Sequence, residues 1–180
     1  VMKKAILSLV ILTFSISLNA QQKFTSVVQF MDSLAIWTKK KTPYAEVDSI
    51  VVKNAIGIRQ HGSMWILIGD NIDEDAFKLA IFENRFTKTV SHFSMIRSYN
   101  YYCKELETDL AITKGFLESS KFINPVFKEM VKTSNGAGFM YLSKNLDICI
   151  GIKSVYQNGK IYLTTIFAPK ELYDTIKYGE

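Results

Sequence analysis

The sequence is poor in the residues that bind metals and form disulfides. It holds 2 histidines and 2 cysteines in 180 residues, and no two of them have the short spacing of a zinc site. For Cys103 and Cys149 a disulfide and two buried thiols are both open interpretations. The chain also lacks a phosphate-binding glycine loop, a Gly-x-Ser-x-Gly elbow and a His-Glu-x-x-His pair. The enzyme classes that such motifs mark are therefore not indicated.

The chain also has little net charge with which to attract a polyanion. It carries 22 basic and 17 acidic residues, for a net charge of +5. Without Lys3 and Lys4 the balance is 20 to 17, or +3. The one basic cluster, at 39–41, fits the solvated end of a helix. We therefore expect no nucleic-acid partner.

The first twenty residues are typical of an export signal. Lys3 and Lys4 precede an apolar run over 5–18, and Ala20 offers a small residue at the cut. The run has 14 residues, whereas a spanning helix needs roughly 20. We therefore expect 1–20 to be a cleaved signal peptide, a secreted or periplasmic location, and no transmembrane anchor after cleavage; an uncleaved anchor is the alternative. Residues 21–180 contain no linker, which favours a single domain.

Apolar residues recur at helical spacing in four segments, which predict helices over 24–41, from 48 to about 65, over 73–86, and from 124 onwards. The first should end at Thr42-Pro43, since proline removes a hydrogen-bond donor. The last begins at Asn124-Pro125, which suits a cap followed by the first helical residue. The segment 89–111 has no clear period and stays unassigned.

The end of the chain predicts a β-hairpin. Two β-rich runs, 148–156 and 160–168, flank Asn158-Gly159, a pair that readily adopts the positive φ of a tight turn. Alternate residues of the second run are apolar on both faces, so both faces should be covered by helices. This predicts an α+β domain, an α-β-α sandwich around an antiparallel sheet that ends in this hairpin.

The stretch 134–168, SNGAGFMYLSKNLDICIGIKSVYQNGKIYLTTIFA, resembles the CAP family: cysteine-rich secretory proteins, venom antigens, plant pathogenesis-related proteins and their bacterial, SCP-like relatives. Members show an Ile-Gly-Ile/Val-Gly strand before a turn and a strand ending near Phe, and Ile150-Gly151-Ile152 sits at the expected separation. Upstream, Ser91-His92 resembles the family's Ser-His, and 107–111 resembles its Gly-Glu-Asn-Ile-Ala. The resemblance covers about 50–168 and implies a bacterial CAP-like domain.

The resemblance also implies a cleft. Members carry two histidines and two glutamates there, which can hold a divalent cation. The corresponding cleft and ligand candidates in this chain are His92, Glu107, Thr108, Glu129 and Gly138. Of these, His92, Glu107 and Glu129 are the metal candidates. Because glycine occupies the second histidine position, we expect a degraded metal site, no resident cofactor, and at most a weakly bound divalent cation.

The implied role is non-catalytic binding of a lipid, a small apolar ligand or a cell-surface partner in a groove. Aromatic residues that could line such a groove are Tyr99, Tyr101, Tyr102, Phe116 and Phe122. Acid–base catalysis needs a positioned pair of titratable groups, so catalysis is the less favoured interpretation. The alternatives are a secreted, metal-assisted hydrolase using His92, His61 and nearby acids, and an unrelated α+β domain. His92 itself fits either a cleft residue or a partly buried histidine bonded to backbone.

Overall fold

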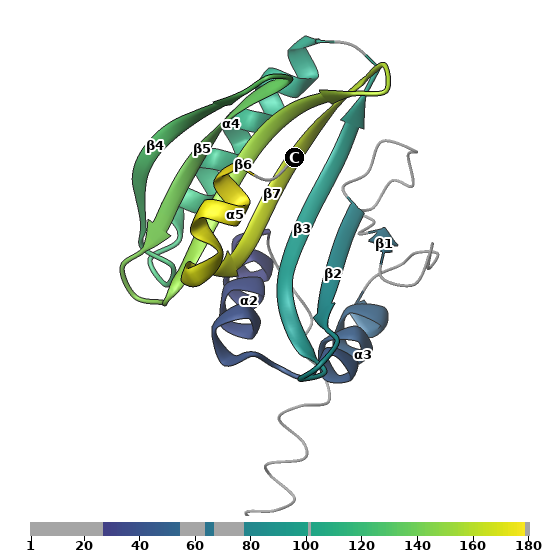
Figure 1. Ribbon diagram of the computed structural model, residues 1–180, viewed down its shortest axis with the longest axis vertical. Coiled ribbons are helices and arrows are strands. Elements are labelled where there is room, and N and C mark those ends of the chain that lie inside the picture. The colour runs from purple at the N-terminus through teal and green to yellow at the C-terminus, as the bar shows by residue number, and fades with distance from the viewer. Residues whose placement is uncertain (1–26, 55–63, 67–77, 101, 179–180) are drawn as a thin grey trace, which may run out of the picture.

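The computed structural model describes residues 27–54, 64–66, 78–100 and 102–178, which form a sheet with helices packed on it (Figure 1). In chain order the elements are α2 (Val27–Lys40), α3 (Tyr44–Asn54), β1 (Met64–Ile66), β2 (Lys78–Asn84), β3 (Thr89–Tyr99), α4 (Lys104–Ser119), β4 (Pro125–Thr133), β5 (Gly136–Ser143), β6 (Ile148–Gln157), β7 (Lys160–Pro169), the 3-10 turn η1 (Lys170–Leu172) and α5 (Tyr173–Tyr178). None of these helices is long and apolar enough to cross a membrane.

The described strands form one seven-stranded antiparallel sheet in the order β1-β2-β3-β7-β6-β5-β4. Within β1–β3 and within β4–β7, strands that are consecutive in the sequence are neighbours in the sheet. The two groups meet where β3 pairs with β7. Helix α4 joins β3 to β4, the strand at the far edge. In Figure 1 this connection carries α4 behind β5 and β6.

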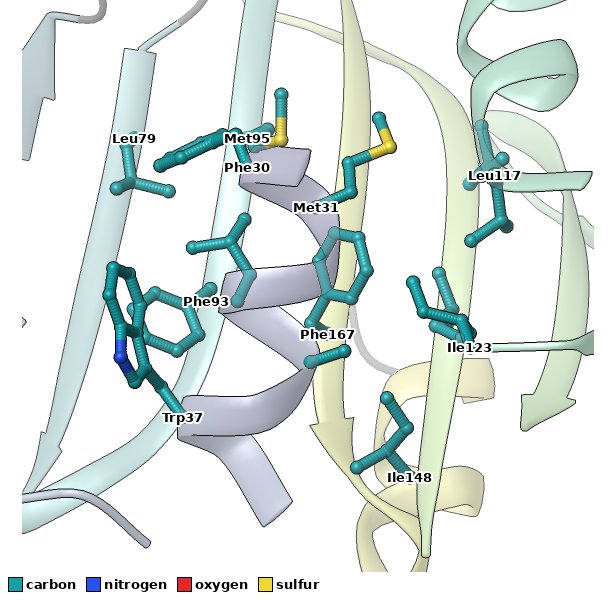
Figure 2. Packing of buried hydrophobic residues seen from close by; sticks show 14 of the residues in the cluster. Phe30, Met31, Trp37, Leu79, Phe93, Met95, Leu117, Ile123, Ile148 and Phe167 are labelled. Carbon is teal, nitrogen blue, oxygen red and sulfur yellow. The ribbon is translucent and has the colours of Figure 1, made fainter. Parts of the chain in front are cut away.

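Helices α2 and α4 pack on one face of the sheet, which we call the α2 face. It is the face that carries Phe93 of β3 and Phe167 of β7, and Figure 2 shows Met31 and Trp37 of α2 beside these rings. The Trp37 and Phe93 ring centroids lie 6.0 Å apart. Leu117 of α4 belongs to the same buried cluster. Since each fully buried side chain of this size stabilises the fold by about 1.5–3 kcal/mol, this face holds the main core.

The opposite face, which we call the α5 face, has a smaller buried cluster, made of Val131, Met140, Cys149, Ala168 and Ile176. Ile176 comes from α5, which follows η1 and packs on β6 and β7. In Figure 1 α5 lies in front of the sheet, whereas α2 and α4 lie behind it.

The predicted α-β-α sandwich is wrong. The structure is a single antiparallel sheet whose two long packed helices share one face, and the helix described on the other face has six residues. Strand β6 explains the asymmetry, because it directs Ile150 and Ile152 to the α2 face but Gly151 and Lys153 to the α5 face. The α5 face therefore offers a second layer little apolar area to bury.

Two predicted elements are confirmed. Helix α2 ends at Lys40, just before Thr42-Pro43, as the sequence predicts. Strands β6 and β7 form the expected hairpin, closed by the pair Gln157↔Lys160. Asn158 and Gly159 have φ values of 51° and 78°, which is the left-handed conformation that a two-residue hairpin turn requires.

Three predicted helices are wrong in whole or in part. The helix predicted over 48–65 is α3, which ends at Asn54, and 64–66 is strand β1; 55–63 lie outside the described residues. The described part of 73–86 contains strand β2, and the segment after Asn124 is strand β4. Asn124 has a φ of 47°, so it turns the chain into a strand and caps no helix.

The two cysteines are free thiols on opposite sides of the sheet. Cys103 packs against the α2-face cluster, whereas Cys149 is buried in the α5-face cluster. The sheet separates the two sulfur atoms, so the open disulfide interpretation does not apply. Burial raises the pKa of the Cys149 thiol to about 11, which suppresses the reactive thiolate.

Candidate functional site

His92 lies on β3 at the α5 face. Its ring stacks on Phe82 of β2, with centroids 4.1 Å apart and planes inclined by 9°. Its Nδ1 lies 3.3 Å from Ser91 Oγ. Burial lowers the pKa of His92, so the ring is neutral at physiological pH.

Glu129 lies on β4 at the same face, where its carboxylate binds side chains of α5. It accepts hydrogen bonds from the Tyr173 hydroxyl at 2.8 Å and from Lys177 Nζ at 2.9 Å. These two donors hold the pKa of Glu129 below its usual value. Three strands separate β4 from β3, which places Glu129 about 19 Å from His92 across the sheet at the usual strand spacing.

The metal candidates are therefore not brought together. Glu107 lies on α4, on the other side of the sheet from His92 and Glu129. Across the part of the chain that the structure describes, no three His, Cys, Asp or Glu residues form a group that could hold a metal ion. His61, named for the hydrolase alternative, lies outside the described residues.

Two of the five cleft candidates do meet. Glu107 and Gly138 line one groove of about 380 Å³, between the start of α4 and the strands of the α2 face. The residues that line the groove are Tyr102, Leu106, Glu107, Leu110, Met130, Asn135, Gly136, Ala137, Gly138, Phe139, Ile152, Ser154, Tyr156 and Ile161. Thr108 lines a different, polar pocket of about 250 Å³, together with Arg97, Lys104, Glu105 and Asp109.

The groove forms where two hairpin turns meet the first turns of α4. The backbone N–H of Tyr156, near the β6–β7 turn, donates to the carbonyl of Asn135 in the β4–β5 turn at 2.7 Å. At Gly136 a Cβ would lie 2.2 Å from the Ser154 carbonyl oxygen, so only glycine allows this close approach. Figure 1 shows these turns and the start of α4 at the same end of the sheet.

Gly138 is also required by its neighbours. A Cβ there would lie 2.6 Å from the Ile152 carbonyl oxygen and 2.8 Å from Cγ of Lys153. A histidine, which the family carries at the position matched by Gly138, does not fit this backbone. These steric contacts therefore explain why position 138 is a glycine in this fold.

The groove is apolar inside and has exposed aromatic groups at its rim. Phe139, Ile152 and Ile161 of the strands belong to or pack against the main core. At the rim, Tyr102 is 65% exposed and Tyr156 is 58% exposed. Exposed apolar surface gathered in one place marks a site of interaction.

Glu107 stands at the rim and interacts with Tyr102, whose hydroxyl donates to Glu107 Oε1 at 2.7 Å. No other residue that lines the groove is acidic or basic. The groove therefore combines an apolar interior with a single carboxylate.

The neighbouring polar pocket contains a structural ion pair. Asp109 Oδ2 accepts hydrogen bonds from Arg97 Nη1 and from the Tyr99 hydroxyl, each at 2.5 Å. Burial and the Asp109 carboxylate raise the pKa of Tyr99 far above its usual value. These contacts fasten α4 to β3.

Of the aromatic candidates that the structure describes, Tyr102 alone lines the groove. Tyr99 is buried in the main core, Phe116 packs against that core, and Tyr101 lies outside the described residues. Sequence reasoning missed Tyr156 and Ile161, although both flank the predicted Asn158-Gly159 turn. It missed Met130 because the segment was predicted as a helix.

No protein-family model matches this chain, and searches of curated proteins and of solved structures found no match. The resemblance to the CAP family therefore stays a prediction that rests on the residues quoted for it.

Proposed function

We propose that the protein is a non-catalytic binding module that holds a lipid or another small apolar molecule in the groove beside α4. The observation that carries the proposal is the groove of about 380 Å³ itself, with its apolar strands and its exposed rim. Small-molecule sites typically measure about 300–1,000 Å³ and are lined by apolar and aromatic side chains with a few polar groups. Leu106, Leu110 and Ile161 give this groove that composition.

The side chains around the groove favour binding over catalysis. Glu107 is its one charged residue, and the hydroxyl beside it belongs to Tyr102, which is exposed. General acid–base catalysis uses two positioned groups whose pKa values are driven apart. The metal-assisted hydrolase gains no support from the described residues, because His92 and Glu129 each lie elsewhere in distinct contacts.

A pair of matched variants tests the proposal. Ala137 is exposed on β5 and lines the groove, so Ala137→Trp should fill it, and tryptophan suits a strand. Ala111 is exposed on α4 and does not line the groove, so Ala111→Trp is the control. Nile red serves as an apolar fluorescent probe. We expect Ala137→Trp to weaken its binding about tenfold or more, since the lost apolar burial exceeds about 1.4 kcal/mol.

The control should bind Nile red as the wild type does, and both variants should keep the wild-type circular dichroism spectrum. A wild-type protein that does not bind the probe, or an Ala137→Trp protein that binds it unchanged, contradicts the proposal.

A further inference from the structure

We propose that the groove selects an amphiphile with one positively charged head group, which Glu107 and the rim tyrosines hold while the apolar tail lies along α4. This inference rests on the proposed function, because it names the ligand class of the same groove.

The charge of the groove has one sign. Among its fourteen lining residues Glu107 alone is charged, and the other polar side chains, Asn135 and Ser154 among them, are neutral. Glu107 uses Oε1 to accept the Tyr102 hydroxyl, and the described residues give Oε2 no partner. A carboxylate has about four lone-pair positions, so most of its capacity to accept hydrogen bonds stays available to a ligand.

Aromatic rings lie where a cation would need them. Tyr102 touches the Glu107 carboxylate and is largely exposed, and Tyr156 lies on the same rim. The faces of aromatic rings attract ammonium groups, with a contribution that rises as water is excluded. Phe139, in the same groove, already receives a cation, since Lys114 Nζ lies 4.3 Å from its centroid.

The apolar residues then assign the direction of the ligand. Leu110 follows Leu106 by four residues and Glu107 by three, so these side chains line the groove on the same side of α4. A head group at Glu107 thus leaves its tail against Leu110 and Phe139. An anionic head group would instead lie beside the Glu107 carboxylate, where like charges repel.

Lys114 does not reverse this preference. It does not line the groove, and it follows Glu107 by seven residues, which is about 10 Å along a helix. Its ammonium lies over Phe139, on the side of the groove assigned to the tail, whereas the Glu107 carboxylate lies at the head group.

Three ligands with the same decyl tail test the inference below their micellar concentrations: decyltrimethylammonium, 1-decanol and decanoate. Isothermal titration at low salt should show the ammonium binding about three- to tenfold more tightly than the alcohol, as expected for a partly exposed charge pair with an aromatic contribution. Decanoate should bind most weakly. Raising the salt concentration should narrow these differences.

Glu107→Gln should remove the preference for the ammonium and leave the affinity for 1-decanol unchanged. Glu105→Gln is the matched control, because Glu105 lies in the same first turn of α4 but lines the neighbouring polar pocket. It should keep the wild-type preference.

The outcomes separate this inference from the proposed function. If 1-decanol binds the wild type but the ammonium binds no better, or decanoate binds best, the inference is overturned and the apolar groove stands. A preference that survives Glu107→Gln also overturns it. If none of the three ligands binds the wild type, both proposals fail together.

Discussion

At the scale of single residues, one buried hydroxyl works against stability. Thr165 of β7 is fully buried on the α2 face, between Met95 and Ile152 in the sheet register. Among the described residues its Oγ1 has no hydrogen-bond partner. A buried polar group without a partner costs about 1–3 kcal/mol, because it gives up its bonds to water.

We therefore expect Thr165→Val to raise the free energy of unfolding by about 1 kcal/mol, since valine keeps the shape and removes the hydroxyl. Urea denaturation followed by circular dichroism measures the change. Thr164→Val, one residue away on the half-buried opposite face, is the control and should bring no comparable gain. A destabilised Thr165→Val protein would mean that the hydroxyl is in fact bonded.

Single residues also show what the sequence could reveal about the site. Glu107 and Gly138 entered through the resemblance, and both line the groove. No sequence motif indicated that Tyr156 and Ile161 line the same groove. They lie near α4 only because of the order of the strands in the sheet. The fit of Gly138 against Lys153 depends on a contact between neighbouring strands, which spacing along the chain does not report.

At the scale of elements, α5 is held by contacts rather than by its own length. A six-residue helix is unstable alone, since nucleation costs more than so few hydrogen bonds return. Glu129 binds it through Tyr173 and Lys177, and Ile176 packs into the α5-face cluster. Buried Lys153 donates to the Lys177 carbonyl at 3.2 Å.

These contacts make the attachment of α5 dependent on pH. Because the folded-state pKa of Glu129 is lowered, its contribution is complete above the ordinary glutamate pKa and is lost as the pH falls through the lowered value. At neutral pH, Glu129→Gln should therefore lower the protection of the α5 amides against hydrogen exchange. In acid the variant and the wild type should converge, after correction for intrinsic exchange rates.

Glu171→Gln is the control for that experiment. Glu171 lies beside α5 and pairs with Lys41, but both side chains are more than half exposed, and such pairs contribute little. Equal α5 protection in the wild type and the Glu129→Gln protein at neutral pH would contradict the assignment.

Elements also show where prediction from sequence succeeded and failed. Helix α2 and the β6–β7 hairpin carry strong local signals, a regular apolar period and a turn pair with positive φ. Strand β4 was mistaken for a helix because a β-bulge between Phe127 and Glu129 shifts its alternation. The shift puts Phe127 and Met130 on one face, a spacing of three that imitates a helix.

At the scale of the whole molecule, the predicted export signal is open to direct test. The full chain, expressed in a bacterial host that has a periplasm, should appear there without residues 1–20. Intact mass and N-terminal sequencing should find Gln21 as the first residue. Replacing Leu7 and Leu9 of the apolar run with arginine should hold the full-length chain in the cytoplasm. Recovery of unprocessed wild-type chain in the membrane fraction would favour the uncleaved anchor instead.

The position of β7 determines when the molecule can fold. It is the last strand to be synthesised, yet it lies in the middle of the sheet and joins β1–β3 to β4–β6. Until residues 160–169 emerge from the ribosome, neither half of the sheet can reach the other, and the surface of α2 has no complete sheet to cover. The β3–β7 and β6–β7 pairings that unite the two halves of the sheet can therefore form only after most of the chain has been synthesised.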